Sequence, residues 1–259
     1  MNRTAQLFNN KERKDILSIY FTAGYPRLDS TLDIAEGLER AGVDFLEIGF
    51  PYSDPLADGP VIQHSSQIAL KNGMSLDVLF EQLKDLRKRV NIPVFLMGYF
   101  NTVFQYGVER FCKACVEVGV DGVIVPDLPI YEYEELYEEI FKENGISNIF
   151  LVTPQTTDER IRKIDGLSTG FIYLLSSSAT TGKDLEVSEE RLNYFKRIKA
   201  LDLKNPVVIG FGISNHYTFK QAAGIANAAI IGSAFVKQLE TENYLERIPE
   251  FITGIKEGK

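Results

Sequence analysis

The sequence has few of the side chains that hold metal ions. Its 259 residues include two cysteines and two histidines. Cys112 and Cys115 form one C-x-x-C pair in a helical pattern, and the second pair that a zinc site needs is absent. We interpret the pair as small core-facing residues one helical turn apart, with a redox role as the alternative. His64 and His216 lie in or beside expected loops without ligand spacing, which disfavours metal-dependent chemistry.

Long apolar runs and an excess of positive charge are missing too. No stretch reaches the roughly 18 apolar residues of a membrane-spanning helix, and residues 1–15 contain no signal-peptide core. The formal net charge of −8 argues against nucleic acid or an anionic membrane as the main partner. A small phosphorylated substrate is compatible with this charge, because backbone N–H groups at helix N-termini bind phosphate. We therefore expect a cytoplasmic protein that acts on a small molecule.

Eight short apolar runs alternate with amphipathic stretches along the chain. The runs are rich in Val, Ile, Leu and Phe, as expected for strands buried on both faces. They span residues 17–21, 44–48, 93–97, 122–125, 148–152, 171–175, 206–209 and 228–231. Three amphipathic stretches predict helices over Thr31–Ala41, Ser75–Arg89 and Tyr133–Lys142. In the third expected helix, Leu136 and Ile140 lie on one apolar stripe.

This alternation predicts parallel strands joined by right-handed crossovers. Eight such units close most naturally into one α/β domain over residues 1–259, a (β/α)8 or TIM barrel. A doubly wound open sheet is the alternative. The step between the second and third runs is long enough for a loop and an extra helix, and we expect another added helix at the N-terminus. Both the long second loop and the polar loop after the sixth run follow strand C-termini, where barrels build their active sites.

One acidic residue interrupts an apolar run. Glu47 lies between Leu46 and Ile48, near the C-terminal end of the second expected strand. A carboxyl group inside a barrel loses hydration, which raises its pKa and makes it an acid or base near neutral pH. The alternatives are a buried ion pair, or a strand offset that turns Glu47 toward solvent.

Two aspartates follow in the loop of residues 53–60, which reads SDPLADGP. Asp54 precedes proline and Asp58 precedes glycine, so each taken alone is typical of a turn or a helix cap. The prolines and glycine around Asp58 stiffen the loop over the expected barrel mouth. The position of Asp58 on the same face as Glu47 favours a role in the site.

Glycine-bearing turns follow the sixth, seventh and eighth runs. They span residues 179–182, 210–214 and 232–234. Barrels frequently bind phosphate with the loops after strands seven and eight and a short helix, which Ser233 would cap. None of these turns contains Lys or Arg, so we expect backbone amides to hold the phosphate. No G-x-G-x-x-G follows the first run, and no run contains a lysine for Schiff-base chemistry.

Together these motifs resemble the α subunit of tryptophan synthase. The matching segments are FTAGYP (21–26), LEIGFPYSDPLADGP (46–60), YLLS (173–176), GFGIS (210–214) and GSA (232–234). The similarity runs in register from about Leu7 to Glu240. It implies cleavage of indole-3-glycerol phosphate into indole and glyceraldehyde 3-phosphate, without a cofactor on this chain.

The resemblance also implies roles for individual residues. Glu47 would be the acid/base, Asp58 would bind the indole nitrogen, and Tyr173 would lie beside Glu47. The indole pocket would be lined by Tyr20, Met97, Ile124 and Phe211. The phosphate would be held by Gly182, Gly210, Gly212, Gly232 and Ser233. Residues 177–190 are expected to form a lid, with a hydrogen bond from Thr181 to Asp58 in its closed state.

The resemblance further implies a β subunit that carries pyridoxal phosphate, in an α2β2 heterotetramer. The alternatives are a stand-alone indole-3-glycerol-phosphate lyase and a non-catalytic α-like subunit that activates a β partner. Another phosphate-binding barrel enzyme would need a paired aspartate or a lysine at strand ends. One departure from the family pattern, S-x-x-G-V-T-G, is visible: Ala179 and Thr180 stand where Gly and Val are usual.

Overall fold

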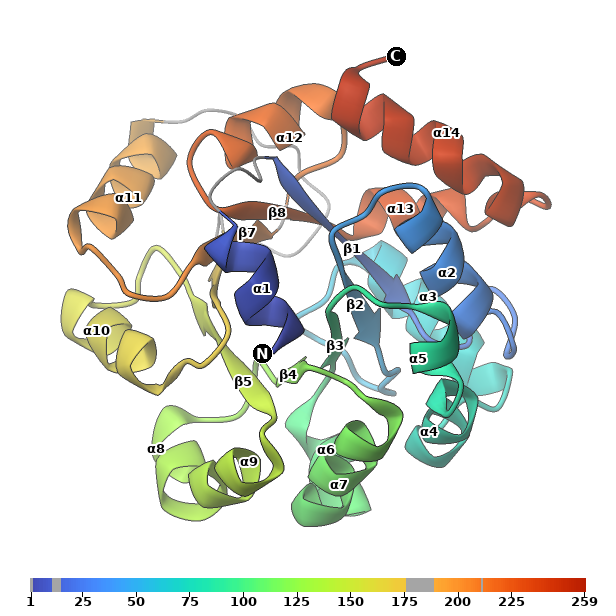
Figure 1. The fold of residues 1–259 in the computed structure, drawn as a ribbon, viewed down its shortest axis with the longest axis horizontal. Coiled ribbons are helices and arrows are strands. Elements are labelled where there is room, and N and C mark those ends of the chain that lie inside the picture. The colour runs from blue at the N-terminus through green and yellow to red at the C-terminus, as the bar shows by residue number, and fades with distance from the viewer. Residues whose placement is uncertain (1, 11–14, 176–188, 211) are drawn as a thin grey trace.

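The eight apolar runs form eight strands, and these strands close into a barrel. In this computed structural model each strand pairs in parallel with its neighbours in the sequence, and β8 pairs with β1 (Figure 1). The structure describes residues 2–10, 15–175, 189–210 and 212–259. The strands are β1 Ile16–Thr22, β2 Phe45–Gly49, β3 Val94–Met97, β4 Gly122–Ile124, β5 Ser147–Val152, β6 Ile172–Leu175, β7 Val207–Gly210 and β8 Ala228–Ile231. The predicted barrel is confirmed, and the open sheet is wrong.

Helices surround the barrel, and both added helices are present. They are α1 Arg3–Asn9 at the N-terminus and α3 Pro60–Lys71 after β2. The others are α2 Thr31–Arg40, α4 Leu76–Leu83, α5 Leu86–Arg89, α6 Phe100–Tyr106, α7 Val108–Val118, α8 Ile130–Glu132, the π-helix η1 Tyr133–Tyr137, α9 Glu138–Asn144, α10 Asp158–Leu167, α11 Glu189–Ala200, α12 His216–Ala223, α13 Ser233–Gln238 and α14 Tyr244–Glu257. Within the described residues, no helix is long and apolar enough to span a membrane.

Two helix predictions were wrong in detail. The helix expected over Ser75–Arg89 is divided into α4 and α5 by a turn at residues 84–85. The apolar stripe expected at Leu136 is wrong, because 55% of the surface of Leu136 is exposed. The π-helical turn of η1 shifts the helical register, so that Tyr133 and Phe141 face the barrel and pack edge to face, with ring centroids 5.5 Å apart.

Aromatic side chains close the N-terminal end of the barrel. Phe45, Phe95 and Phe171 are fully buried inside it, with ring centroids 5.1 to 6.0 Å apart. From α1, Phe8 adds a ring 6.1 Å from both Phe45 and Phe171. Figure 1 looks onto this end and shows α1 lying across the middle of the barrel. These rings fill this end of the barrel, opposite to the end where the strands have their C-termini.

Three similar side-chain contacts fix the register of the strands at this closed end. Asp44, Asp121 and Asn227 directly precede β2, β4 and β8, and each accepts a backbone N–H from the start of the preceding strand. The donors are Leu17, Val94 and Val207, at 2.9, 2.8 and 2.8 Å. The first two acceptors end the same tripeptide, Gly-Val-Asp, at residues 42–44 and 119–121. The repeat satisfies backbone donors that the barrel ladder leaves unpaired.

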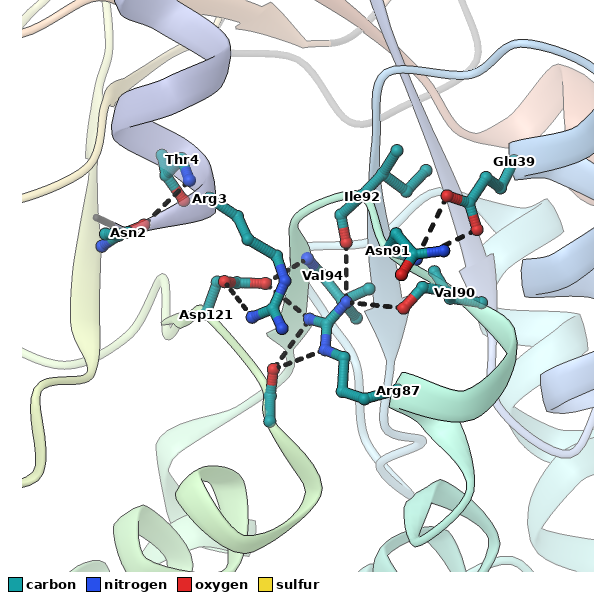
Figure 2. A network of polar contacts seen from close by, with 11 residues as sticks. Asn2, Arg3, Thr4, Glu39, Arg87, Val90, Asn91, Ile92, Val94 and Asp121 are labelled. Carbon is teal, nitrogen blue, oxygen red and sulfur yellow. Dashed lines mark hydrogen bonds and ion pairs between the residues drawn. The ribbon is translucent and has the colours of Figure 1, made fainter.

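A buried ion pair reinforces one of these contacts. Asp121, whose side chain is 5% exposed, lies 2.6 Å from a guanidinium nitrogen of Arg87 and 3.2 Å from one of Arg3. Figure 2 shows the Arg87 side chain extending from α5, where it also donates to the backbone carbonyls of Val90 and Ile92. The network therefore joins α1 and α5 to the start of the strands.

Arg87→Met should lower the free energy of unfolding by roughly 3 kcal/mol, because it removes the closest partner of a buried carboxylate. Lys88→Met is the matched control, since Lys88 pairs with Asp85 and both side chains are largely exposed. That variant should lose less than about 1 kcal/mol. Urea denaturation of both variants measures the difference, and equal losses would show that the buried network contributes no more than a surface pair.

Candidate active site

Glu47 lies inside the barrel with none of its surface exposed. It is paired in register with Tyr20 of β1 and Phe95 of β3. Among the described residues, neither carboxylate oxygen has a hydrogen-bond partner. Burial without a partner disfavours the charged form and raises the pKa of Glu47 to about 8. The alternative of a solvent-facing Glu47 is therefore wrong, and the carboxyl group is poised to exchange a proton near neutral pH.

Two buried tyrosines share the interior with Glu47. Tyr20 comes from β1 and Tyr173 from β6. Burial raises the pKa of Tyr173 well above its ordinary value, and the negative charges of Glu47 and Asp58 raise it further. The pKa of Tyr20 is raised by burial and then by Asp58. Both hydroxyls therefore keep their protons, and both lie within electrostatic reach of the two acidic residues.

Glycines at two strand ends make room for these rings. A Cβ atom at Gly49 would lie 2.2 Å from the Tyr20 hydroxyl, and one at Gly210 would lie 2.1 Å from the Tyr173 hydroxyl. Real side chains do not approach backbone positions so closely, so only glycine fits at either position. Gly210, which the sequence assigned to phosphate binding, therefore also has a packing role.

Asp58 lies half-buried in the loop between β2 and α3. Its Oδ2 accepts a hydrogen bond from the Tyr99 hydroxyl at 3.2 Å. Burial raises the pKa of Asp58 to about 6, although the hydrogen bond from Tyr99 lowers it in part. Asp54 differs, because it is exposed and accepts from the neighbouring Ser53 at 2.6 Å. The structure thus separates a turn-forming aspartate from one that faces the barrel mouth.

A cavity of about 680 Å³ opens at the C-terminal ends of the strands. Tyr20, Asp58 and Met97, all predicted site residues, line it together with Tyr99 and Leu175. The predicted residues Glu47, Ile124 and Tyr173 are buried and contribute no surface to it. The cavity also extends over β5 and α10, along Leu151, Thr153, Gln155 and Arg160, which the sequence did not single out.

The glycine turns after β7 and β8 lie side by side, since these two strands pair. Gly212 has a positive φ of 76°, which favours glycine. Gly232 is the N-cap of α13, so the expectation that Ser233 caps this helix is wrong: Ser233 is its first residue. Thr181, Gly182, Phe211 and residues 177–188 of the predicted lid lie outside the described residues.

Tyr99 lines the cavity and donates a hydrogen bond to Asp58, and the sequence reasoning missed it. It follows Met97 and Gly98 at the end of β3, a strand-end position at the mouth of the barrel. A Cβ at Gly98 would lie 2.1 Å from the ring of Phe50, so glycine is required there too. The only signal for Tyr99 in the sequence was its position directly after a strand-end glycine.

A parallel eight-stranded barrel with one carboxyl group buried in its interior and a second at its mouth defines a (β/α)8-barrel enzyme of acid–base chemistry. A family model described as tryptophan synthase alpha chain matches residues 7–255. The chain is 56% identical to the tryptophan synthase alpha chain of Flavobacterium psychrophilum over 98% of this chain and 100% of that one. It is 54% identical to that of Christiangramia forsetii, with 99% of each chain covered.

Solved structures agree with the sequence relatives. The tryptophan synthase complex of Pyrococcus furiosus contains a chain that matches with a TM-score of 0.85 at 35% identity, covering 94% of this chain and 98% of that one. The chain belongs to the tryptophan synthase alpha chain family. It is a carbon–carbon lyase of tryptophan biosynthesis that cleaves indole-3-glycerol phosphate into indole and glyceraldehyde 3-phosphate.

The stability of the fold should depend on pH through Glu47. Its folded pKa lies above the ordinary value, so the wild type loses stability as pH rises from about 4.5 toward about 8, by about 1.4 kcal/mol per pH unit. Glu47→Gln has no such proton to lose. Its free energy of unfolding relative to wild type should therefore increase with pH across this window.

Urea denaturation of wild type and Glu47→Gln at the two ends of that window measures this difference. A difference that does not change with pH would mean that Glu47 titrates alike in the folded and unfolded states.

Proposed function

We propose that Glu47 and Asp58 carry the cleavage of indole-3-glycerol phosphate within a single catalytic domain of residues 1–259. The observation that carries the proposal is the pair of carboxyl groups with separated pKa values, about 8 for buried Glu47 and about 6 for half-buried Asp58. Two acidic groups in different environments can take different roles at one pH.

The chemistry needs an electron sink, because cleavage of the C–C bond leaves an electron pair on the indole ring. Protonation of indole C3 forms an indoleninium, which accepts that pair. Asp58 is the group that stabilises the positive charge at the indole nitrogen, since it is ionised above about pH 6. Glu47, which holds its proton to about pH 8, donates that proton to C3, and the resulting carboxylate removes the hydroxyl proton from the glycerol carbon as the C–C bond breaks. Because Glu47 contributes no surface to the cavity, its side chain must turn toward the substrate to do so.

We assign the indole ring to the part of the cavity near Tyr20 and Met97, with Tyr173 beside Glu47. Ile124 is buried and pairs in register with Met97, so it lies next to this wall on the neighbouring strand. The resemblance to the family adds Phe211 to the pocket and Thr181 as the partner of Asp58. These two assignments are proposals that rest on sequence alone.

We assign the phosphate to the backbone amides of Gly210, Gly212, Gly232 and Ser233, joined by Gly182. The pairing of β7 with β8 supports this, because it places two of the glycine turns next to each other. Gly232 also lies near the site, since a Cβ there would be 3.6 Å from the ring of Tyr20.

We further propose that the chain assembles with a tryptophan synthase β subunit as an α2β2 heterotetramer in the cytoplasm. Pyridoxal phosphate would be on the β subunit. The similarity to the Pyrococcus furiosus tryptophan synthase complex supports such a partner. A stand-alone lyase would differ in its independence of that partner.

Indole release from indole-3-glycerol phosphate, measured with the purified chain alone and with a cognate β subunit, tests the function. Glu47→Gln should lower this rate by roughly 10² to 10⁴-fold, as expected for loss of a general acid–base group, with the fold intact. Near wild-type turnover in the variant would reject the role of Glu47. Full activity without any β subunit would favour the stand-alone lyase.

Gly232→Ala tests the phosphate site. The nearest atom to a Cβ at Gly232 is 3.6 Å away, an ordinary contact, so the added methyl group meets no clash within the chain. The methyl group should weaken glycerol phosphate binding by roughly tenfold or more, because it blocks close approach of the ligand to the backbone. Isothermal calorimetry measures the Kd.

Gly166→Ala is the control for this measurement, since nothing lies within 4 Å of a Cβ at that glycine in α10. An unchanged Kd in Gly232→Ala would remove Gly232 from the phosphate site.

A further inference from the structure

The side chain of Asp58 has one hydrogen-bond partner among the described residues, Tyr99. Its backbone is held separately. The Asp58 N–H donates to the Pro55 carbonyl at 3.0 Å, and Gln63 Nε2 donates to the Asp58 carbonyl at 2.8 Å. These contacts fix the loop but leave the carboxylate free to rotate. The orientation of the carboxylate therefore depends on Tyr99.

The Tyr99 hydroxyl makes two hydrogen bonds to the same loop. It accepts from the Ala57 N–H at 3.0 Å and donates to Asp58 Oδ2 at 3.2 Å. Its ring stacks on Tyr52, with centroids 5.0 Å apart and planes inclined by 25°. Acceptance from Ala57 directs the hydroxyl proton toward Asp58, so Tyr99 acts as an oriented donor.

The backbone beside Tyr99 is itself anchored. Tyr99 is the N-cap residue of α6, and the next N–H, that of Phe100, donates to Asp127 Oδ1 at 2.8 Å. Asp127 lies in the loop after β4, so two neighbouring strand-end loops support the ring. The backbone beside Tyr99 is thus held by the loop after β4, whereas its ring and hydroxyl contact the loop of Asp58 at Tyr52 and Ala57.

The groups around Asp58 explain why the hydrogen bond from the Tyr99 hydroxyl matters. Besides Tyr99, the hydroxyls of Tyr20 from β1 and Tyr173 from β6 lie within electrostatic reach of its carboxylate. No cation of the described residues contributes to the pKa of Asp58. Burial and the charge of Asp58 raise the pKa of Tyr99 above its ordinary value, so the hydroxyl keeps its proton. Tyr99 therefore supplies the stabilising hydrogen bond to ionised Asp58.

We propose that Tyr99 is a positioning residue that fixes the Asp58 carboxylate at the mouth of the cavity, facing the indole nitrogen. This inference rests on the proposed role of Asp58 and deepens it. Tyr99 acts through Asp58, because a hydrogen bond to the charged form both orients that form and favours it.

Tyr99→Phe keeps the stacked ring and removes the hydroxyl. It should lower kcat by about tenfold, the effect of one hydrogen bond to a charged group. The Kd for glycerol phosphate should stay unchanged, because we assign the phosphate to the glycine turns and not to the loop of Asp58. The pKa of Asp58, followed by carbon-13 NMR of the carboxyl group, should rise by about one pH unit. If Tyr99 served only to support the local fold, this substitution would leave the pKa of Asp58 unchanged.

Tyr106→Phe is the matched control. It removes a tyrosine hydroxyl at the opposite end of α6. The ring of Tyr106 packs against Phe80, with centroids 5.6 Å apart. The control should retain the kcat and the Asp58 pKa of wild type. An equal effect of both substitutions would mean that Tyr99 acts by supporting α6 and would overturn the proposal.

A double-mutant cycle with Asp58→Ala completes the test. If Tyr99 acts through Asp58, then Tyr99→Phe should cause little further loss of kcat in the Asp58→Ala background. A further tenfold loss there would overturn the positioning role while leaving Asp58 in place. Near wild-type kcat in Asp58→Ala itself would instead reject the proposed role of Asp58, and the inference with it.

Discussion

The site depends on one buried carboxyl group, that of Glu47, for which the described part of the chain supplies no hydrogen-bond partner. Glu47 interrupts an apolar strand and lies inside a barrel whose other end is filled by aromatic rings. An isolated carboxylate is costly there, so the group holds its proton to about pH 8. This desolvation cost raises the pKa of Glu47 into the range where it can exchange a proton near neutral pH. The surrounding residues keep the group buried. Gly49 and Gly210 allow the rings of Tyr20 and Tyr173 to fill space that water would otherwise occupy.

Stability and chemistry occupy opposite ends of the barrel. At the closed end, Asp44, Asp121 and Asn227 pair backbone donors, and Arg87 and Arg3 neutralise Asp121. These side chains, two of them carboxylates, have partners and support the register of the strands. At the open end, Glu47 has no partner and Asp58 has one neutral donor among the described residues. The same side-chain types thus differ in function because of their partners, as is general for barrel enzymes.

The barrel and the buried position of Glu47 could be predicted from the sequence, because both signals are local. A strand buried on both faces is a short apolar run, and an acid within such a run is visible without any knowledge of the fold. Tyr99 could not be predicted, since its contact with Asp58 joins residues 41 positions apart and depends on the relative height of two strand ends. Leu136 was misplaced because a π turn has no clear sequence signature, and Ser233 because helix starts vary by a residue.

The protonation state of Glu47 in the folded chain tests this account most directly. Infrared difference spectra between wild type and Glu47→Gln, recorded across a pH series, report the carbonyl stretch of the protonated carboxyl group. The account predicts that this band is present at neutral pH and disappears with a midpoint at about pH 8. A midpoint near 4.5, the ordinary value for glutamate, would show that Glu47 is hydrated or paired and would contradict the central claim.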